Sequence, residues 1–186
     1  MALLTILTAP DPRLKKKAKP VEKVDDGVRR LMAEMLETMY AAPGIGLAAP
    51  QVGVGKRVIV LDVAREGEPK NPLKLVNPEI VSVSDDDATY EEGCLSVPEH
   101  YAEVVRPRAV KVRCLDETGA KREIEAEGLL ATCLQHEIDH LDGVLFIDHL
   151  SALKRTMILR KLLKEKKAAE RGDAKEKSEE SPQHRL

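Results

Sequence analysis

His136-Glu137-Ile138-Asp139-His140 is the stretch of this 186-residue chain from which both fold and chemistry can be read. It lies in a predicted helix from Gly128 to Leu141, which Asp142-Gly143 ends. Residues four apart share one face of a helix with Cβ atoms about 5–6 Å apart, so His136 and His140 can bind one metal ion. Glu137 lies beside them, where it can act on a water molecule at that ion.

A helix end rich in His, Glu and Asp can also be a solvated surface turn that binds nothing. Leu129 and Cys133, however, continue the stripe of His136 and His140 toward the start of the helix. The histidines are therefore expected beside apolar residues, and this position favours a metal site over a surface turn.

A hydrolytic metal site usually has three protein ligands and leaves one position for water. Phe146 stands where a metzincin protease has its third histidine, which excludes that class. The first glutamate after His140 is Glu165, in a separate charged segment, so a thermolysin-like third ligand is disfavoured. We therefore expect the third ligand upstream of the helix.

The three cysteines differ in their surroundings. Cys94 is the best upstream ligand candidate, because it lies between Gly93 and an extended segment ended by Pro98, with no apolar periodicity. Cys114 and Cys133 fall at apolar positions of a strand and a helix and are interpreted as small buried hydrophobes. No cysteine belongs to a C-x-x-C pair, so we expect no disulfides and a reducing compartment.

The rest of the chain predicts a single α+β domain. The other expected elements are a first strand over 2–9, an amphipathic helix from Asp26 to Pro43-Gly44, strands over 57–63 and 75–83 with an interruption at Asn77-Pro78, an exposed turn over 85–87, a hairpin of 110–114 and 121–126, and a third helix that begins at Ser151 and carries Leu153, Met157, Leu162 and Leu163. Because βαβ alternation is absent, we expect largely antiparallel sheets packed around a central helix that carries H-E-x-x-H, with a C-terminal helix.

Composition narrows the functions open to the chain. Only 2% of its residues are aromatic, so stacking on nucleic-acid bases has few side chains to use. The formal net charge of −2 gives no global attraction to nucleic acid or to an anionic membrane. No apolar run approaches the roughly 18 residues that span a bilayer, so we expect no membrane partner. From residue 154 onward eleven Lys and Arg stand against six Asp and Glu, so a basic segment follows an acidic body.

Three stretches together resemble the signature motifs of the peptide deformylase family, in the same order and at similar spacing. They are Gly44-Ile45-Gly46-Leu47-Ala48-Ala49-Pro50-Gln51, Glu92-Gly93-Cys94-Leu95-Ser96 and Gln135-His136-Glu137-Ile138-Asp139-His140. The resemblance covers the chain from about Leu4 to Leu163. It implies a catalytic domain over 1–164, followed by a charged helix end or a disordered tail over 165–186.

The resemblance implies an enzyme that uses a divalent metal ion to hydrolyse the N-formyl group of the formyl-methionine that begins a nascent polypeptide, releasing formate. By similarity, Cys94, His136 and His140 hold the ion and Glu137 is the general base. Fe(II) is the implied metal in the cell, and zinc, nickel or cobalt suit the same ligands in purified protein.

The resemblance also implies how the substrate is held. The side-chain amide of Gln51 and the backbone N–H of Leu95 are implied as donors to the developing oxyanion. The substrate backbone is implied to lie against Ile45, Gly46 and Gly93. The implied pocket for the methionine side chain is formed by Ile45, Leu129, Thr132 and Cys133. Some relatives carry a larger aliphatic residue at Thr132 and an arginine at Tyr101.

Several further expectations come from the family or from the chain's charge. Members approach the ribosome through a C-terminal helix, and the basic run from Lys154 to Lys167 implies the same partner and a cytoplasmic location. Glu92 and Arg108 are expected to form a supporting pair near the metal. His100, His149 and His184 are interpreted as surface groups without a role. The alternatives are a zinc peptidase, and a metal-stabilised module that docks on RNA through its basic end.

Overall fold

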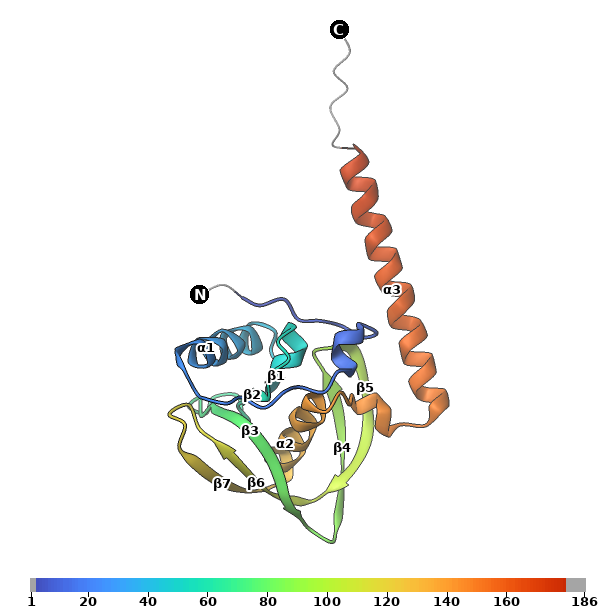
Figure 1. Ribbon diagram of the computed structural model, residues 1–186. Helices are drawn as coiled ribbons and strands as arrows, with labels where there is room; N and C mark the ends of the chain where they lie inside the picture. The colour runs from blue at the N-terminus through green and yellow to red at the C-terminus, as the bar shows by residue number, and fades with distance from the viewer. Residues whose placement is uncertain (1–2, 180–186) are drawn as a thin grey trace.

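The computed structural model describes the backbone of residues 3–179 and the side chains of residues 3–171 (Figure 1). The elements in chain order are η1 (Pro12–Lys15), α1 (Asp26–Ala41), β1 (Gly46–Ala48), η2 (Ala49–Val52), β2 (Val58–Leu61), β3 (Leu73–Val83), β4 (Asp87–Cys94), β5 (Val97–Pro107), β6 (Ala109–Leu115), β7 (Lys121–Glu127), α2 (Gly128–Leu141), η3 (Phe146–His149) and α3 (Ala152–Glu179), where η denotes a short 3-10 helix. None of the helices in this described part is long and apolar enough to cross a membrane.

The strands form two antiparallel sheets. One sheet has five strands in the order β1-β2-β3-β6-β7, and the other consists of β4 and β5. Figure 1 shows α2 flanked by both sheets, with α1 beside β1 and β2 and with α3 extending away from the body. The predicted α+β class, with antiparallel sheets around the helix that carries H-E-x-x-H and with a C-terminal helix, is confirmed.

Strand β2 explains how the five-stranded sheet holds a helix on each face. All four of its residues, Val58 to Leu61, are fully buried, and alternate side chains point to opposite faces of a strand. Ile59 and Leu61 belong to the cluster that includes Leu134 of α2. Val58 and Val60 belong to the cluster that includes the buried methionines of α1. The short apolar run is therefore a doubly covered central strand.

Helix α2 has the predicted bounds, Gly128–Leu141, and a glycine fixes its end. Gly143 adopts a φ of +76°, and a Cβ there would lie 2.4 Å from the backbone oxygen of Lys15. Only glycine permits both the left-handed conformation and this close approach. The end of α2 is thereby docked against the N-terminal segment, where Ala18 N donates to Leu141 O.

Helix α1 also begins and ends close to the prediction. Asp25 accepts a hydrogen bond from Val28 N at 2.9 Å, which caps the helix, and the helix ends at its C-cap residue, Ala42.

The predicted interruption at Asn77 is a bulge inside a single strand, β3. Asn77 takes a φ of +50° there, and its side-chain amide bonds both backbone groups of Val21 at 2.8 Å.

One expected strand is absent, and two observed strands were not predicted. Residues 3–9 form no strand, because their hydrogen bonds to the body are isolated ones, such as Leu7 N to Gln51 O, and do not build a ladder. Strands β4 and β5 were not predicted, because their charged residues interrupt the apolar alternation expected of a half-buried strand.

Helix α3 begins where predicted and continues through Glu179. Of its four apolar residues named from the sequence, only Leu162 is buried, while Leu153, Met157 and Leu163 are exposed. The division of the chain into 1–164 and 165–186 stays a prediction, and residues 180–186 lie outside the described part.

Candidate metal centre and active site

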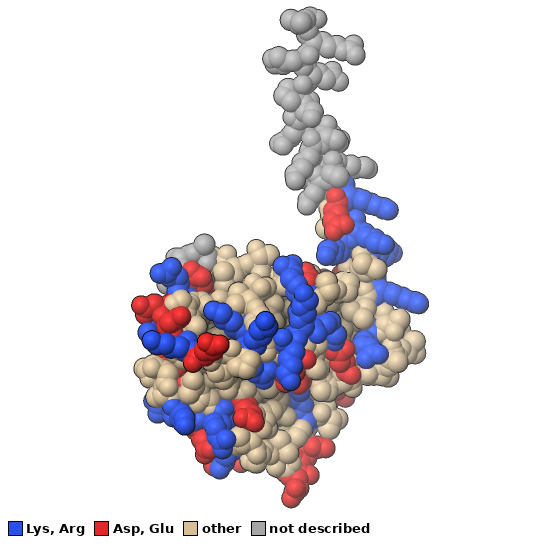
Figure 2. All heavy atoms as spheres, viewed as in Figure 1, with Lys and Arg blue, Asp and Glu red and all other residues tan. Residues whose placement is uncertain are grey.

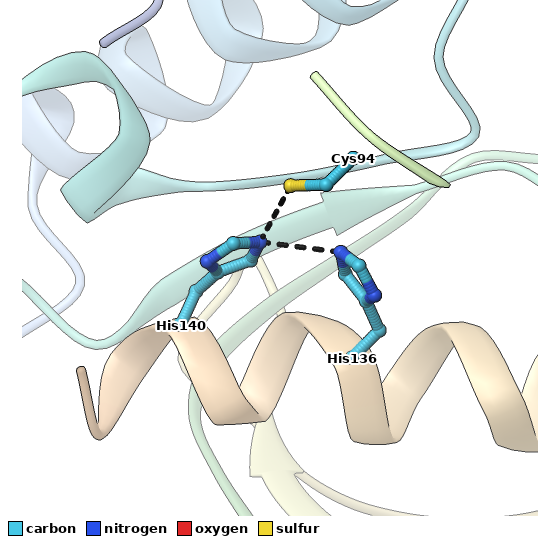
Figure 3. A group of neighbouring side chains, drawn as sticks. All are labelled: Cys94, His136 and His140. Atoms are coloured by element: carbon cyan, nitrogen blue, oxygen red, sulfur yellow. Dashed lines mark hydrogen bonds between the residues drawn. The ribbon is translucent and has the colours of Figure 1, made fainter. Parts of the chain in front are cut away.

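Three potential metal ligands converge where the end of β4 meets α2 (Figure 3). Cys94 is the last residue of β4, and His136 and His140 project from one face of α2, one turn apart. The Nε2 atom of His140 lies 3.3 Å from Cys94 Sγ and 3.2 Å from His136 Nε2. All three ligand atoms lie within 4.8 Å of one another. One thiolate and two imidazoles in this arrangement form a donor set that fits a first-row divalent ion.

A buried carboxylate fixes the orientation of the His136 ring. The Nδ1 atom of His136 lies 2.9 Å from Glu92 Oε2, so an Nδ1–H donated to this carboxylate leaves Nε2 free as a ligand. Arg106 holds the same carboxylate with two bonds, at 2.6 and 3.0 Å. Burial alone would raise the pKa of Glu92, but the hydrogen bonds from His136 and Arg106 lower it to about 2. Glu92 is therefore a charged support for the metal ligand.

The expected Glu92–Arg108 pair is wrong, because Arg106 pairs with Glu92 instead. Arg106 and Val104 are two residues apart on β5, so their side chains point to the same face, and both are buried. Arg108 follows Pro107, where the strand ends, and its exposed side chain pairs with Asp86 at 2.6 Å. Spacing in the sequence alone cannot tell which of two arginines two residues apart pairs with Glu92. The structure decides this, because Arg106 lies within β5 and Arg108 lies beyond its end.

Arg106 also connects the centre to His149, which was interpreted from the sequence as a surface group without a role. Its Nη1 atom donates to Asp139 Oδ2 at 2.8 Å, and the same oxygen lies 2.8 Å from His149 Nε2. His149 is therefore part of a hydrogen-bonded chain behind the metal ligands. No local sequence motif predicts this role of His149, because its contact with Asp139 forms only when η3 packs against α2. His184 lies outside the described residues.

Glu137 lies in the pocket with one oxygen unsatisfied. The residue is 4% exposed, and its Oε2 atom has no hydrogen-bond partner among the described residues. Burial raises the pKa of Glu137 to about 7. A Cβ at Gly46 would lie 2.3 Å from Glu137 Oε1, so only a glycine at that position leaves room for this carboxylate. A buried carboxylate with a pKa near neutrality is suited to accept and release a proton.

The amide of Gln51 is held in one orientation at the same pocket. Its Oε1 accepts from Ala48 N at 2.8 Å, and its Nε2 donates to Ser96 Oγ at 3.0 Å and lies 3.5 Å from Cys94 Sγ. The backbone of the first motif therefore turns the donor end of this amide toward the ligands. Leu95 packs its side chain against Gly44, where a Cβ would lie only 2.7 Å from Leu95 Cδ1.

The pocket beside the ligands has a volume of about 410 Å³. It brings together eleven of the twelve site residues expected from the sequence, namely Ile45, Gly46, Gln51, Gly93, Cys94, Leu95, Leu129, Thr132, Cys133, His136 and Glu137. His140 is the twelfth, and it completes the ligand cluster beneath this surface. Cys133 and Cys114 are buried as predicted, and burial raises the pKa of the Cys114 thiol to about 11. All three cysteines are free thiols.

Comparisons with known proteins agree with this geometry. The family model described as "Polypeptide deformylase" matches residues 3–156. A peptide deformylase of Phenylobacterium zucineum is 64% identical over 169 residues, which cover 91% of this chain and all of the relative. A peptide deformylase of Agrobacterium fabrum is 57% identical and covers 90% of this chain and 99% of the relative.

Solved structures give the same result. The crystal structure of a peptide deformylase from Ehrlichia chaffeensis has a TM-score of 0.86 at 43% identity and covers 90% of this chain and 99% of its own. One from Legionella pneumophila has a TM-score of 0.84 at 52% identity, with coverage of 91% and 99%. The chain therefore belongs to the polypeptide deformylase family, and it is a metal-dependent hydrolase that removes N-formyl groups.

Proposed function

We propose that the chain hydrolyses the formyl amide of N-formyl-methionyl polypeptides and releases formate, with one divalent metal ion held by Cys94, His136 and His140. The observation that carries this proposal is the convergence of the three ligand atoms in the same pocket as Glu137, whose Oε2 atom has no hydrogen-bond partner among the described residues. When bound, a divalent ion supplies Lewis acidity, which polarises a carbonyl group and lowers the pKa of a water molecule.

Glu137 acts as the general base and then as the general acid. Its carboxylate takes one proton from the water that attacks the formyl carbon, and it passes this proton to the amine nitrogen as the C–N bond breaks. The products are formate and a free amino terminus. The burial of Glu137, its unsatisfied Oε2 and its pKa near 7 support both transfers.

Gln51 and Leu95 stabilise the charge that develops on the formyl oxygen. The Nε2 of Gln51 and the backbone N–H of Leu95 donate to this oxygen, and removal of one such donor typically costs about 2.7–4 kcal/mol. The support for Gln51 is its oriented amide, whose oxygen accepts a hydrogen bond from Ala48 N.

The pocket selects methionine by its apolar lining. The substrate backbone lies against Ile45, Gly46 and Gly93, and the methionine side chain enters between Ile45 and the face of α2 that carries Leu129, Thr132 and Cys133. These α2 residues lie one to two turns before His136. This spacing supports a binding slot next to the reacting group. A flexible thioether suits such an apolar slot.

Fe(II) is the proposed metal in the cell, with zinc, nickel or cobalt as functional substitutes in purified protein. The thiolate and two imidazoles suit all four ions. Three free cysteines, one of them a metal ligand, support a cytoplasmic, reducing location.

The ribosome is the proposed partner of α3. Figure 2 shows Lys and Arg side chains gathered along the described part of this helix. They are Lys154, Arg155, Arg160, Lys161, Lys164, Lys166, Lys167 and Arg171. An exposed cationic face of this kind binds phosphate backbones without needing aromatic residues.

The decisive experiment measures formate release from a formyl-methionyl tripeptide by anaerobically prepared, metal-replete protein. Glu137→Gln should retain the metal and lose turnover by about 10²–10⁴-fold. Glu22→Gln changes an exposed carboxylate outside the pocket and serves as the matched control, with unchanged turnover expected. Chelation should abolish turnover, and re-addition of Fe(II) should restore it.

A second candidate function, beside the hydrolase activity, is RNA docking through α3, which the basic residues of this helix favour. Salt-sensitive RNA binding by the wild-type protein would support this second function, and absence of RNA binding at low salt would refute it.

A further inference from the structure

A groove of about 290 Å³, lined by both polar and apolar side chains, lies between β5 and the start of α3, beside the active-site pocket. Its lining residues are Tyr101, Ala102, Glu103, Leu150, Lys154, Met157 and Ile158. Met157 is 62% exposed, and Ile158 and Leu150 are half-buried against the cluster beneath. The proposed reaction gives this groove no role.

Tyr101 belongs to both the groove and the active-site pocket. It stands opposite Gly93 in the β4–β5 register, and a Cβ at Gly93 would lie 2.5 Å from the tyrosine ring. The ring therefore lies against the backbone of Gly93, which only a glycine allows. Although 68% exposed, Tyr101 is held at the boundary between the two hollows.

An irregularity in β5 places Tyr101 there. Cys94 pairs with Val97, whereas Gly93 pairs with Tyr101, so residues 98–100 have no partner on β4 and bulge out. Glu99 in this bulge has a φ of +61°, a conformation that is uncommon for residues other than glycine. Such bulges re-aim side chains beside active sites. Here the bulge presents Tyr101 at the mouth of the pocket.

We propose that the polypeptide downstream of the formyl-methionine leaves the pocket over Tyr101 and lies in the groove between β5 and α3. This inference rests on the proposed function, since a polypeptide whose first residue is enclosed must cross the surface somewhere. The shared Tyr101 makes the path continuous from Gly93, where the substrate backbone is proposed to lie, to Met157.

The charges of the groove fit this occupant. Glu103 and Lys154 have opposite signs, and the other lining residues are uncharged. The groove thus suits an extended peptide with apolar side chains better than an anionic partner such as RNA, which needs several cations. An extended chain spans at most about 3.3–3.6 Å per residue. Eight residues therefore reach well beyond the pocket, whereas three end close to it.

The test compares kcat/KM for a formyl-methionyl tripeptide with that for an octapeptide that has leucines at positions five to seven. The octapeptide should be about fivefold better, a gain that burial of roughly 40 Å² of apolar surface would give. Met157→Ser should remove this gain and leave tripeptide turnover unchanged. Leu163→Ser is the matched control, since Leu163 is an exposed apolar residue of α3 outside the groove, and it should keep the gain.

Equal kcat/KM for the two peptides, or a gain that persists in Met157→Ser, would overturn the proposal. A dimer at assay concentrations that Met157→Ser dissociates would also overturn it, because a second copy would then cover this groove. Absence of turnover with both peptides is a different result, since it refutes the proposed reaction itself.

Discussion

The surroundings of α2 and the surface of α3 differ in which side chains they bury and which they expose. Around α2, charged groups are buried, and Glu92 is held there by Arg106 and His136. On α3, apolar side chains such as Leu153 and Met157 are exposed, and the cations point into solvent. A buried network of this kind fixes geometry for chemistry. An exposed amphipathic surface leaves side chains free to meet a partner.

The largest expected effect follows from Arg106→Ala, which breaks the buried network. It leaves Glu92 as an uncompensated buried charge, a change that typically costs about 3–5 kcal/mol of folding stability. It also frees the ring of His136, and loss of such support lowers metal affinity by about 10–100-fold. Urea unfolding and metal titration measure the two effects.

Arg108→Ala is the control for that variant. It removes an exposed pair with Asp86, so its cost should not exceed about 1 kcal/mol and its metal affinity should be unchanged. Equal losses in the two variants would mean that the burial of the Arg106–Glu92 pair is irrelevant to the centre.

Gly46→Ala should come next, because the new methyl group displaces Glu137 Oε1, which would lie 2.3 Å away. A displacement of about 1 Å in a catalytic group can lower turnover about 100-fold. The side chain can swing aside, so stability should change by less than about 1 kcal/mol. Formate release and thermal unfolding test this split. Gly55→Ala, where the added Cβ meets no atom within 4 Å, should leave turnover intact.

Leu162→Ala tests how α3 is attached to the body. Leu162 packs with Phe146 and Val104 in a cluster that attaches the helix to the body, and removal of a buried leucine side chain costs about 2 kcal/mol or more. Leu163→Ala, one residue further along, removes a side chain that is 41% exposed and should cost clearly less. Similar unfolding midpoints for the two variants would show that α3 is not attached through this cluster.

The same contrast explains what the sequence could predict. The bounds of α2, the cap of α1 and the two histidine ligands come from local patterns, in which spacing alone determines which side chains share a face. These features depend little on how distant segments pack. Cys94 lies far from the histidines in the sequence, and its convergence with them was predicted from the resemblance to the family motifs.

Features that depend on the packing of distant segments could not be predicted from the sequence. Glu92 and Arg106 are charged residues in buried positions, so β4 and β5 lack the apolar alternation that identifies a strand. The three-residue bulge at 98–100 shifts the register, and no residue pattern announces it. His149 reaches Asp139 only because η3 returns to α2. Each case requires knowledge of a contact between segments far apart in the chain.

The smallest expected effect on chemistry is that of truncation after Lys164, which separates the two regions directly. The described side chains it removes, residues 165–171, are all exposed, so neither the core nor the groove beside Met157 loses a contact. Turnover of a formyl-methionyl tripeptide should therefore stay close to that of the full chain. Ribosome binding, measured by co-sedimentation over a range of salt concentrations, should weaken, because several cations near the phosphates are lost. A large loss of tripeptide turnover would instead show that the exposed end of α3 supports the catalytic centre, and the two regions would then have to be treated as one unit.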